Sequence, residues 1–380
     1  MTAGGTSLTF LNTGDPTGLK FVVERGGRRA VFDFGIQHAP GRAPFSMGLR
    51  PRPGRELADL IWAGEAPRLD GVYARDGGGT GSSPGGGGTG SSPGGGDSAT
   101  AVFLSHLHLD HSSLVRFLDP AVPLYYPARM EELRAAVERS EYLRWRPGSP
   151  GTPVGDRETV QWGELVVRFI AVDHDLPGAT GFLIQAPDVR IAYTGDLRWH
   201  GFHPELSAGF VEAVRGVDVL VQEGVGLGYL RPEADAAAVE PPRLSESDLV
   251  SAFRAELERR PGALLLVNLY PMNRERVAAF GTAAAERGRR LVMEPQAAAI
   301  AGWDALFESE EVAVNPGAFV VQLSFEGLPA LIDLPAPPGS AYIHSSGPPL
   351  GAYDPAYRVV QAWAAVAGLD FLRLGTSGHS

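Results

Sequence analysis

Four side chains that can bind metal ions are crowded into the segment HLHLDH at residues 106–111. The segment follows the strand-like run TAVFLS, so it lies at a turn beyond a strand. In a tight loop His106 and His108 can point the same way and hold one ion, while Asp110 and His111 face a second. Only 9 histidines occur in 380 residues, which disfavours the alternative of ordinary surface histidines. The chain has no cysteine, so imidazole and carboxylate are the available ligands, which suits zinc, manganese or iron.

Three more residues occur in an order that resembles a known family. The segments VFDFG, AVDHDLPGATGFLI and IAYTGDLR contain Asp33, His174 and Asp196. Together with HLHLDH, they resemble the motifs of the metallo-β-lactamase superfamily. The resemblance implies that Asp33 orients ligands from behind, that His174 completes the first metal site and that Asp196 bridges two ions. It implies two divalent ions, with zinc expected and manganese as the alternative, held by His106, His108, Asp110, His111, His174 and Asp196.

Later motifs resemble the β-CASP group of that superfamily, which processes nucleic acid and includes ribonuclease J. They are TGDLRWHG, VDVLVQEG with Glu223, NLYPMNRERVAAFG, and FLRLGTSGHS with His379. The resemblance places His379 near the scissile phosphate. Arginine at a helix start favours phosphate, although a solvated helix face is the alternative. The residues expected to contact substrate are Glu223, Arg274, Arg276, Ser377 and Gly378.

The order of predicted elements indicates an α/β protein with two domains. Short β-type runs dominate up to Glu205, and helices then alternate with buried strands. Ser245 and Asp248 form a capping box that predicts one helix start. We expect a metallo-β-lactamase αβ/βα sandwich over residues 1–228 and an inserted doubly wound α/β (β-CASP-like) domain over residues 229–374. Residues 375–380 would return to the core domain.

A Gly/Ser-rich insert at residues 77–96 contains GGGTGSSPG twice in succession. Such a segment has no packing surface, so we expect a spacer at the pole opposite the chemistry.

The end of the chain departs from the family pattern. In the family the chain continues beyond the SGH motif to a further histidine that completes the second metal site, whereas this sequence ends at Ser380. We expect a fragment of a longer protein; otherwise the second site is incomplete. His200, His203 and His344 are the candidate substitutes.

Composition narrows the range of partners. The net charge of −11 argues against indiscriminate binding to nucleic acid. No apolar stretch is long enough to span a membrane and the N-terminus lacks a secretory signal, so we expect a cytoplasmic protein without a membrane partner. A homodimer is left open.

The resemblance implies a ribonuclease that uses a hydroxide bridging the two ions to attack phosphorus in RNA or single-stranded DNA. Asp110 and Asp196 would orient the hydroxide, and His379 would stabilise the developing charge. Exonuclease and endonuclease action both remain open. One alternative is a small-molecule metallo-hydrolase acting on a lactone, thioester or cyclic phosphodiester, which the acidic charge favours. The other is a non-catalytic nucleic-acid-binding homologue.

Overall fold

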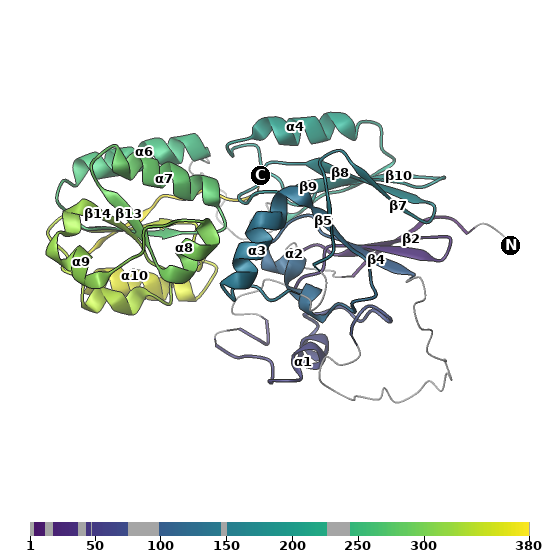
Figure 1. Cartoon of the computed structure of the whole chain (residues 1–380), viewed down its shortest axis with the longest axis horizontal. Helices are drawn as coiled ribbons and strands as arrows, with labels where there is room; N and C mark the ends of the chain where they lie inside the picture. Colours follow the sequence, from purple (N-terminus) through teal and green to yellow (C-terminus); the bar gives the residue numbers. More distant parts are fainter. Residues whose placement is uncertain are drawn as a thin grey trace, which may run out of the picture.

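Two domains lie side by side in the computed structural model, which describes residues 4–11, 18–36, 43–46, 48–74, 99–145, 150–225 and 244–379 (Figure 1). The predicted boundary after residue 228 falls outside these ranges, as do the insert at 77–96 and Ser380.

The first domain is a sandwich of two β-sheets. The six-stranded sheet has the order β1-β2-β3-β4-β5-β6 and the five-stranded sheet the order β11-β10-β9-β8-β7. Their strands are β1 (Ser7–Phe10), β2 (Phe21–Arg25), β3 (Arg28–Phe32), β4 (Thr100–Phe103), β5 (Leu124–Pro127), β6 (Thr152–Val154), β7 (Thr159–Trp162), β8 (Leu165–Ala171), β9 (Thr180–Gln185), β10 (Arg190–Tyr193) and β11 (Val219–Val221). Aromatic rings fill the space between the sheets, where the ring centroids of Phe32 and Phe182 lie 5.3 Å apart.

Helices cover both outer faces of this sandwich. α3 (Glu131–Arg139) packs Leu133 into the same buried cluster as Val102 of the six-stranded sheet. α4 (Pro204–Ala213) packs Phe210 against the five-stranded sheet. The arrangement confirms the predicted αβ/βα sandwich. The other helical segments are α1 (Glu56–Ala63), α2 (Leu109–Ser112), η1 (Ser113–Phe117) and η2 (Ala128–Met130).

The second domain is built on a parallel sheet with the order β13-β14-β12-β15-β16. Its strands are β12 (Leu265–Leu269), β13 (Arg290–Met293), β14 (Phe319–Gln322), β15 (Ala341–Ser345) and β16 (Asp370–Arg373). One face packs against α6 (Glu246–Arg259), α7 (Arg274–Ala285) and α8 (Pro295–Ala301). The other packs against α9 (Ser309–Val314), η4 (Leu328–Ile332) and α10 (Ala356–Val366), and the short turn η3 (Pro316–Ala318) precedes β14. Helices on both faces confirm the doubly wound α/β architecture.

The two domains share buried apolar surface. Tyr270, Met272 and Ile300 of the second domain belong to the core cluster of the first. An ion pair of 2.7 Å joins Arg274 Nη1 to Glu132 Oε1 across the interface, where α8 lies beside α3 (Figure 1). The second domain therefore packs directly against the first.

Several elements differ from the sequence-based expectations. The run MEELRAAVERSEYL is typical of a helix over residues 130–143, whereas α3 ends at Arg139, and α1 and β5 to β7 were not predicted. β5 and β6 are short and contain proline, which weakens the strand pattern. In the described part of the chain, no helix is long and apolar enough to cross a membrane.

Candidate metal centre

The metal-ligand loop is held by an aspartate from the neighbouring strand. β3 and β4 are parallel neighbours, so Asp33 and Ser105 leave the sheet at the same edge. Ser105 donates from its backbone N to Asp33 Oδ1 at 2.7 Å and from Oγ to Asp33 Oδ2 at 2.8 Å. A Cβ at Gly35 would lie 2.2 Å from the carbonyl carbon of Asp110. The loop at 106–111 can therefore approach Asp33 only because glycine stands there.

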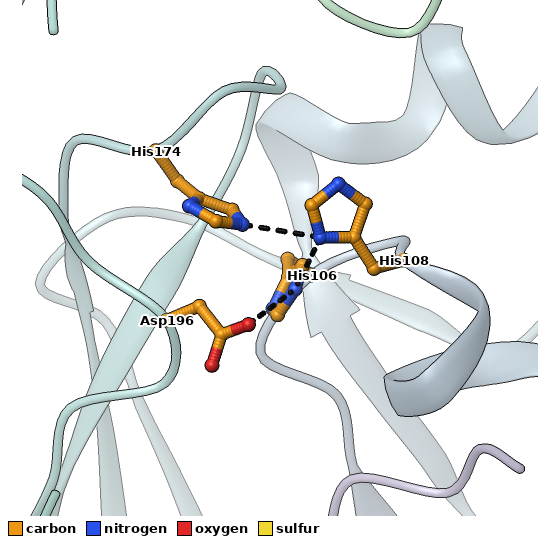
Figure 2. Close-up of side chains that lie close together, drawn as sticks. All are labelled: His106, His108, His174 and Asp196. Atoms are coloured by element: carbon orange, nitrogen blue, oxygen red, sulfur yellow. Dashed lines mark hydrogen bonds and ion pairs between the residues drawn. The ribbon is translucent and has the colours of Figure 1, made fainter. Parts of the chain in front are cut away.

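Three imidazoles converge on one point, as Figure 2 shows. His108 Nδ1 lies 3.1 Å from both His106 Nε2 and His174 Nε2, and Asp196 Oδ2 lies 3.5 Å from His106 Nε2. His174 follows β8 and Asp196 follows β10, so two sheets contribute ligands. Tetrahedral ligands about 2.1 Å from a zinc ion lie roughly 3.4 Å from one another. The four side chains therefore fit one divalent ion.

Hydrogen bonds orient two of the histidine rings through Asp33. Ser105 Oγ already donates to Asp33, so the contact of 2.8 Å between Ser105 Oγ and His106 Nδ1 makes His106 the donor there. His111 Nδ1 lies 2.8 Å from Asp33 Oδ2, which also accepts from the Tyr193 hydroxyl at 2.6 Å. Both rings thus present Nε2 as the ligand atom, as a metal site requires.

The other two rings are oriented by residues that flank the site. His108 Nε2 lies 3.2 Å from Asp175 Oδ1, which leaves Nδ1 to face the first metal position. His174 Nδ1 donates to the carbonyl oxygen of Gly378 at 2.6 Å. All four histidines therefore keep one nitrogen for the metal and use the other to fix the ring.

A second set of ligand atoms lies beside the first. Among the described residues, the buried Nε2 atom of His111 has no hydrogen-bond partner. It lies 3.2 Å from Asp196 Oδ2 and 3.7 Å from Asp110 Oδ2. A ring nitrogen that faces two carboxylates without a hydrogen bond lies where a positive charge, from a proton or a metal ion, is stabilised. Asp196 therefore faces His106 on one side and His111 on the other.

Burial and neighbouring charge shift the pKa values of this cluster. Burial lowers the pKa of His106 well below its usual value and that of His174 to about 3. Burial also acts to lower the pKa of His111, but Asp196 and other carboxylates outweigh it and raise that pKa well above its usual value. His106 and His174 are therefore neutral at physiological pH, as ligation requires.

His379 forms a second group of ligand atoms that could hold a metal ion, together with Asp196 and Glu223. Its Nδ1 atom is 3.3 Å from Glu223 Oε2 and 3.7 Å from Asp196 Oδ2. Burial acts to lower the pKa of His379, but Asp196 and Glu223 raise it to about 9. The structure thus brings His379 and Glu223, which lie 156 positions apart, to the metal cluster.

The comparisons with known proteins agree with this geometry. The family model described as "Beta-lactamase superfamily domain" matches residues 90–254. The chain contains a metallo-β-lactamase superfamily domain. Its cluster of histidines and aspartates fits the divalent metal site that this fold implies.

A solved structure and a curated protein resemble the chain. The crystal structure of a protein of unknown function from Enterococcus faecalis V583 has a TM-score of 0.75 and 29% sequence identity, covering 99% of this chain and 89% of that one. Ribonuclease J of Pyrococcus abyssi is 30% identical over 109 residues, which are 27% of this chain and 24% of that protein. The chain thus matches about a quarter of the length of this curated relative.

The two arginines predicted to contact substrate bond to protein groups in the structure, and the prediction for the buried Arg276 is corrected. Arg276 is 1% exposed, and its guanidinium is bonded to Glu246 at 2.7 and 2.8 Å. Arg274 donates to Glu132 and to the carbonyl of Ile300 at the domain interface. Both side chains hold protein groups together, and the burial of Arg276 leaves it no exposed surface for a phosphate contact.

The three histidines considered as substitute ligands bond elsewhere. His200 Nε2 lies 2.8 Å from the Ser377 carbonyl oxygen, and His344 Nε2 lies 2.8 Å from that of Pro349. His203 Nε2 lies 2.7 Å from Glu275 Oε1. Ser377 and Gly378, predicted to contact substrate, provide carbonyl oxygens to His200 and His174.

Two residues at the centre of the metallo-β-lactamase site were not predicted. Asp175 pairs with His108, and the ring of Tyr270 lies 5.6 Å from the ring of His108. A carboxylate directly after His174 could have indicated the first of these. Tyr270 comes from the second domain, and no local pattern connects it to the metal loop.

Proposed function

We propose that this protein is a phosphodiesterase that hydrolyses nucleic acid, most specifically a ribonuclease similar to ribonuclease J. The observation that carries the proposal is the position of His379, which the second domain delivers to the edge of the metal cluster beside Glu223. An imidazole beside a metal site can stabilise negative charge that develops in a transition state, so His379 suits an anionic substrate such as a phosphodiester. The similarity to ribonuclease J over 109 residues also supports a ribonuclease.

Zinc is the proposed ion and manganese the alternative, because three imidazoles and one carboxylate form the first set of ligands. When bound, such ions lower the pKa of coordinated water towards neutrality and withdraw charge from a phosphoryl oxygen.

The side chains around the site have distinct tasks. Asp110 and Asp196 flank His111 and orient a nucleophile. Glu223 holds the His379 ring in place through Nδ1, and His379 stabilises negative charge on the phosphoryl oxygens. RNA or single-stranded DNA is the proposed partner.

A small-molecule hydrolase is the second candidate, and a specific observation favours it. Arg274 and Arg276, the two cations expected to bind phosphate, are engaged by Glu132 and Glu246. The net charge is −11, so the field of the whole chain repels a polyanion.

Turnover assays on matched substrates test these proposals. The zinc-loaded and manganese-loaded protein is given 5′-monophosphorylated RNA, single-stranded DNA, a generic phosphodiester, a lactone and a thioester. We expect hydrolysis of RNA, and we expect His379→Ala to lower kcat about 100-fold with unchanged metal content. His203→Ala, which changes an exposed histidine, is the control.

Turnover of the lactone or thioester alone would establish the second candidate. Fewer than one metal ion per chain, with RNA binding but no turnover, would instead indicate a non-catalytic binding protein.

A further inference from the structure

A buried cluster of charged residues lies directly behind the metal site. Arg198 and Glu246 are 0% exposed and Arg276 is 1% exposed. Arg198 Nη1 lies 2.6 Å from Glu246 Oε1, and Arg276 lies 2.7 Å from the same oxygen. One carboxylate from the start of α6 thus joins a guanidinium of the first domain to one of the second.

The first arginine is tied to two metal-ligand loops. Arg198 stands two residues after Asp196, and its backbone N donates to the Asp173 carbonyl at 2.9 Å. Its Nε atom lies 3.5 Å from Asp173 Oδ1, and Asp173 directly precedes His174. Movement of Arg198 would therefore move the loops that carry Asp196 and His174.

The second arginine is tied to the segment that carries His379. Arg276 Nη1 donates to the Ser345 carbonyl at 3.1 Å, and Nη2 donates to the Thr376 carbonyl at 3.4 Å. Thr376 begins the segment in which Gly378 accepts the hydrogen bond from His174. Arg276 therefore holds the return segment from the second domain.

Two further contacts connect the same three segments. The N–H of Glu246 donates to the His200 carbonyl at 2.9 Å, and His200 Nε2 lies 2.8 Å from the Ser377 carbonyl. The loop after β10, the start of α6 and the return segment thus meet around one carboxylate.

We propose that Glu246 is a positioning residue that couples docking of the second domain to the geometry of the metal centre. The proposal rests on the metal centre and not on the class of substrate. Arg198 faces Asp175 and Asp173 as well as Glu246, whereas Glu246 is the one ion-pair partner of Arg276 among the described residues, so loss of the Glu246 charge leaves the Arg276 guanidinium uncompensated. Burying charge that is not compensated is costly, so Arg198 or Arg276 must shift and carry its loop along.

Two single variants of α6 test this coupling in the full chain. Glu246→Gln keeps the shape of the side chain and removes its charge. Glu256→Gln is the matched control, because Glu256 lies on the same helix and pairs with Arg259 and Arg260. Zinc affinity is measured by competition with a chromophoric chelator, the cobalt form by its visible absorption spectrum, and the metal-depleted protein by hydrogen exchange.

We expect Glu246→Gln to weaken zinc binding roughly tenfold, as loss of an outer partner of a metal site does. It should alter the cobalt spectrum and speed exchange over residues 173–178, 194–200 and 374–379. Glu256→Gln should leave the zinc affinity, the cobalt spectrum and the hydrogen exchange unchanged, even if its melting temperature falls as much as that of Glu246→Gln.

A double variant keeps the proposal testable if Glu246→Gln folds poorly. Glu246→Gln with Arg276→Gln restores the charge balance, so it should recover part of the lost zinc affinity. Native zinc affinity and native exchange in Glu246→Gln, with only a lower melting temperature, would overturn the proposal. Because no assay uses a phosphodiester, this result is independent of whether the protein is a nuclease.

Discussion

The carbonyl oxygen of Gly378 accepts a hydrogen bond of 2.6 Å from Nδ1 of His174, across 204 positions of the chain. The contact makes the return segment of the second domain part of the first metal site, since it fixes which nitrogen of His174 faces the ion.

Replacing Gly378 with alanine should damage the metal site. A Cβ at Gly378 would lie 2.8 Å from His174 Cε1 and 3.0 Å from Asp175 Cγ, so the carbonyl must move away from His174. We expect zinc affinity to fall roughly tenfold, measured by chelator competition. Gly351→Ala is the control, because its Cβ would lie 3.5 Å from the nearest atom, on Tyr353. Equal affinities in the two variants would contradict this role of Gly378.

Asp175→Asn should also weaken zinc binding. Asp175 Oδ1 lies 3.2 Å from His108 Nε2, and a carboxylate there makes the opposite nitrogen a better ligand. An amide keeps the shape but loses the charge, so we expect an affinity loss of about tenfold. Asp218→Asn, at an exposed carboxylate that accepts from the Arg190 N–H, should bind zinc normally. Retained affinity in Asp175→Asn would mean that Asp175 does not support the metal site.

The metal ligands were predictable because their pattern is local. HLHLDH supplies four candidates within six residues, and the strand ends supply Asp33, His174 and Asp196. The parallel domain was predictable for a similar reason, since apolar strands and capped helices alternate along the chain.

Long-range pairs were not predictable from the sequence. In the sequence, Arg276 at a helix start resembles a phosphate ligand. In the structure its guanidinium instead donates to Glu246, which lies 30 positions earlier. The role of Asp175 depends on its ion pair with His108, which lies 67 positions earlier. Whether a charged side chain is buried against a partner depends on packing, and no local pattern encodes that.

The capping box was one local prediction that the structure confirms. Ser245 Oγ accepts from the Asp248 N–H at 3.1 Å, and Asp248 Oδ2 accepts from the Ser245 N–H at 3.0 Å. Ser245→Ala should lower the free energy of unfolding by about 1 kcal/mol, measured by urea titration. Ser251→Ala removes an exposed hydroxyl that bonds to the Ser247 carbonyl and should cost less than about 0.5 kcal/mol. Equal losses in the two variants would count against the cap.

An ion pair across the domain interface should make stability depend on pH. The hydrogen bond to Glu275 raises the pKa of His203 above its usual value, and burial only partly opposes this. A raised pKa stabilises the folded state fully below the unfolded pKa of about 6.5, and the stabilisation disappears as pH rises through the folded pKa. Because the side chain is 41% exposed, we expect about 0.2 to 1 kcal/mol.

Thermal melts of His203→Gln and Glu275→Gln between pH 5.5 and 8.5 test this linkage. Each variant should lose the same part of the pH dependence. A native pH profile in both would show that the pair contributes nothing to stability.

Removing metal should destabilise the first domain. The imidazoles of His106 and His174 and the carboxylate of Asp196 converge in the folded chain, so an ion bound there stabilises the fold by mass action. At a free ion concentration 100 times the dissociation constant, the stabilisation is about 2.7 kcal/mol. We expect a chelator to lower the melting temperature of the zinc-loaded protein and zinc to restore it.

Asp196→Asn identifies the source of that effect. Asp196 faces His106 at 3.5 Å and His111 at 3.2 Å, and it belongs to both groups of ligand atoms that could hold an ion. The variant should therefore bind less than one zinc ion and lose most of the chelator effect. His344→Gln changes a buried histidine of the second domain that bonds to Pro349 and should keep the full effect. Among the described residues, Asp196 is the carboxylate that faces both His106 and His111. If a chelator lowered the melting temperature of Asp196→Asn as much as that of the native chain, the stabilising ion would therefore bind at another site.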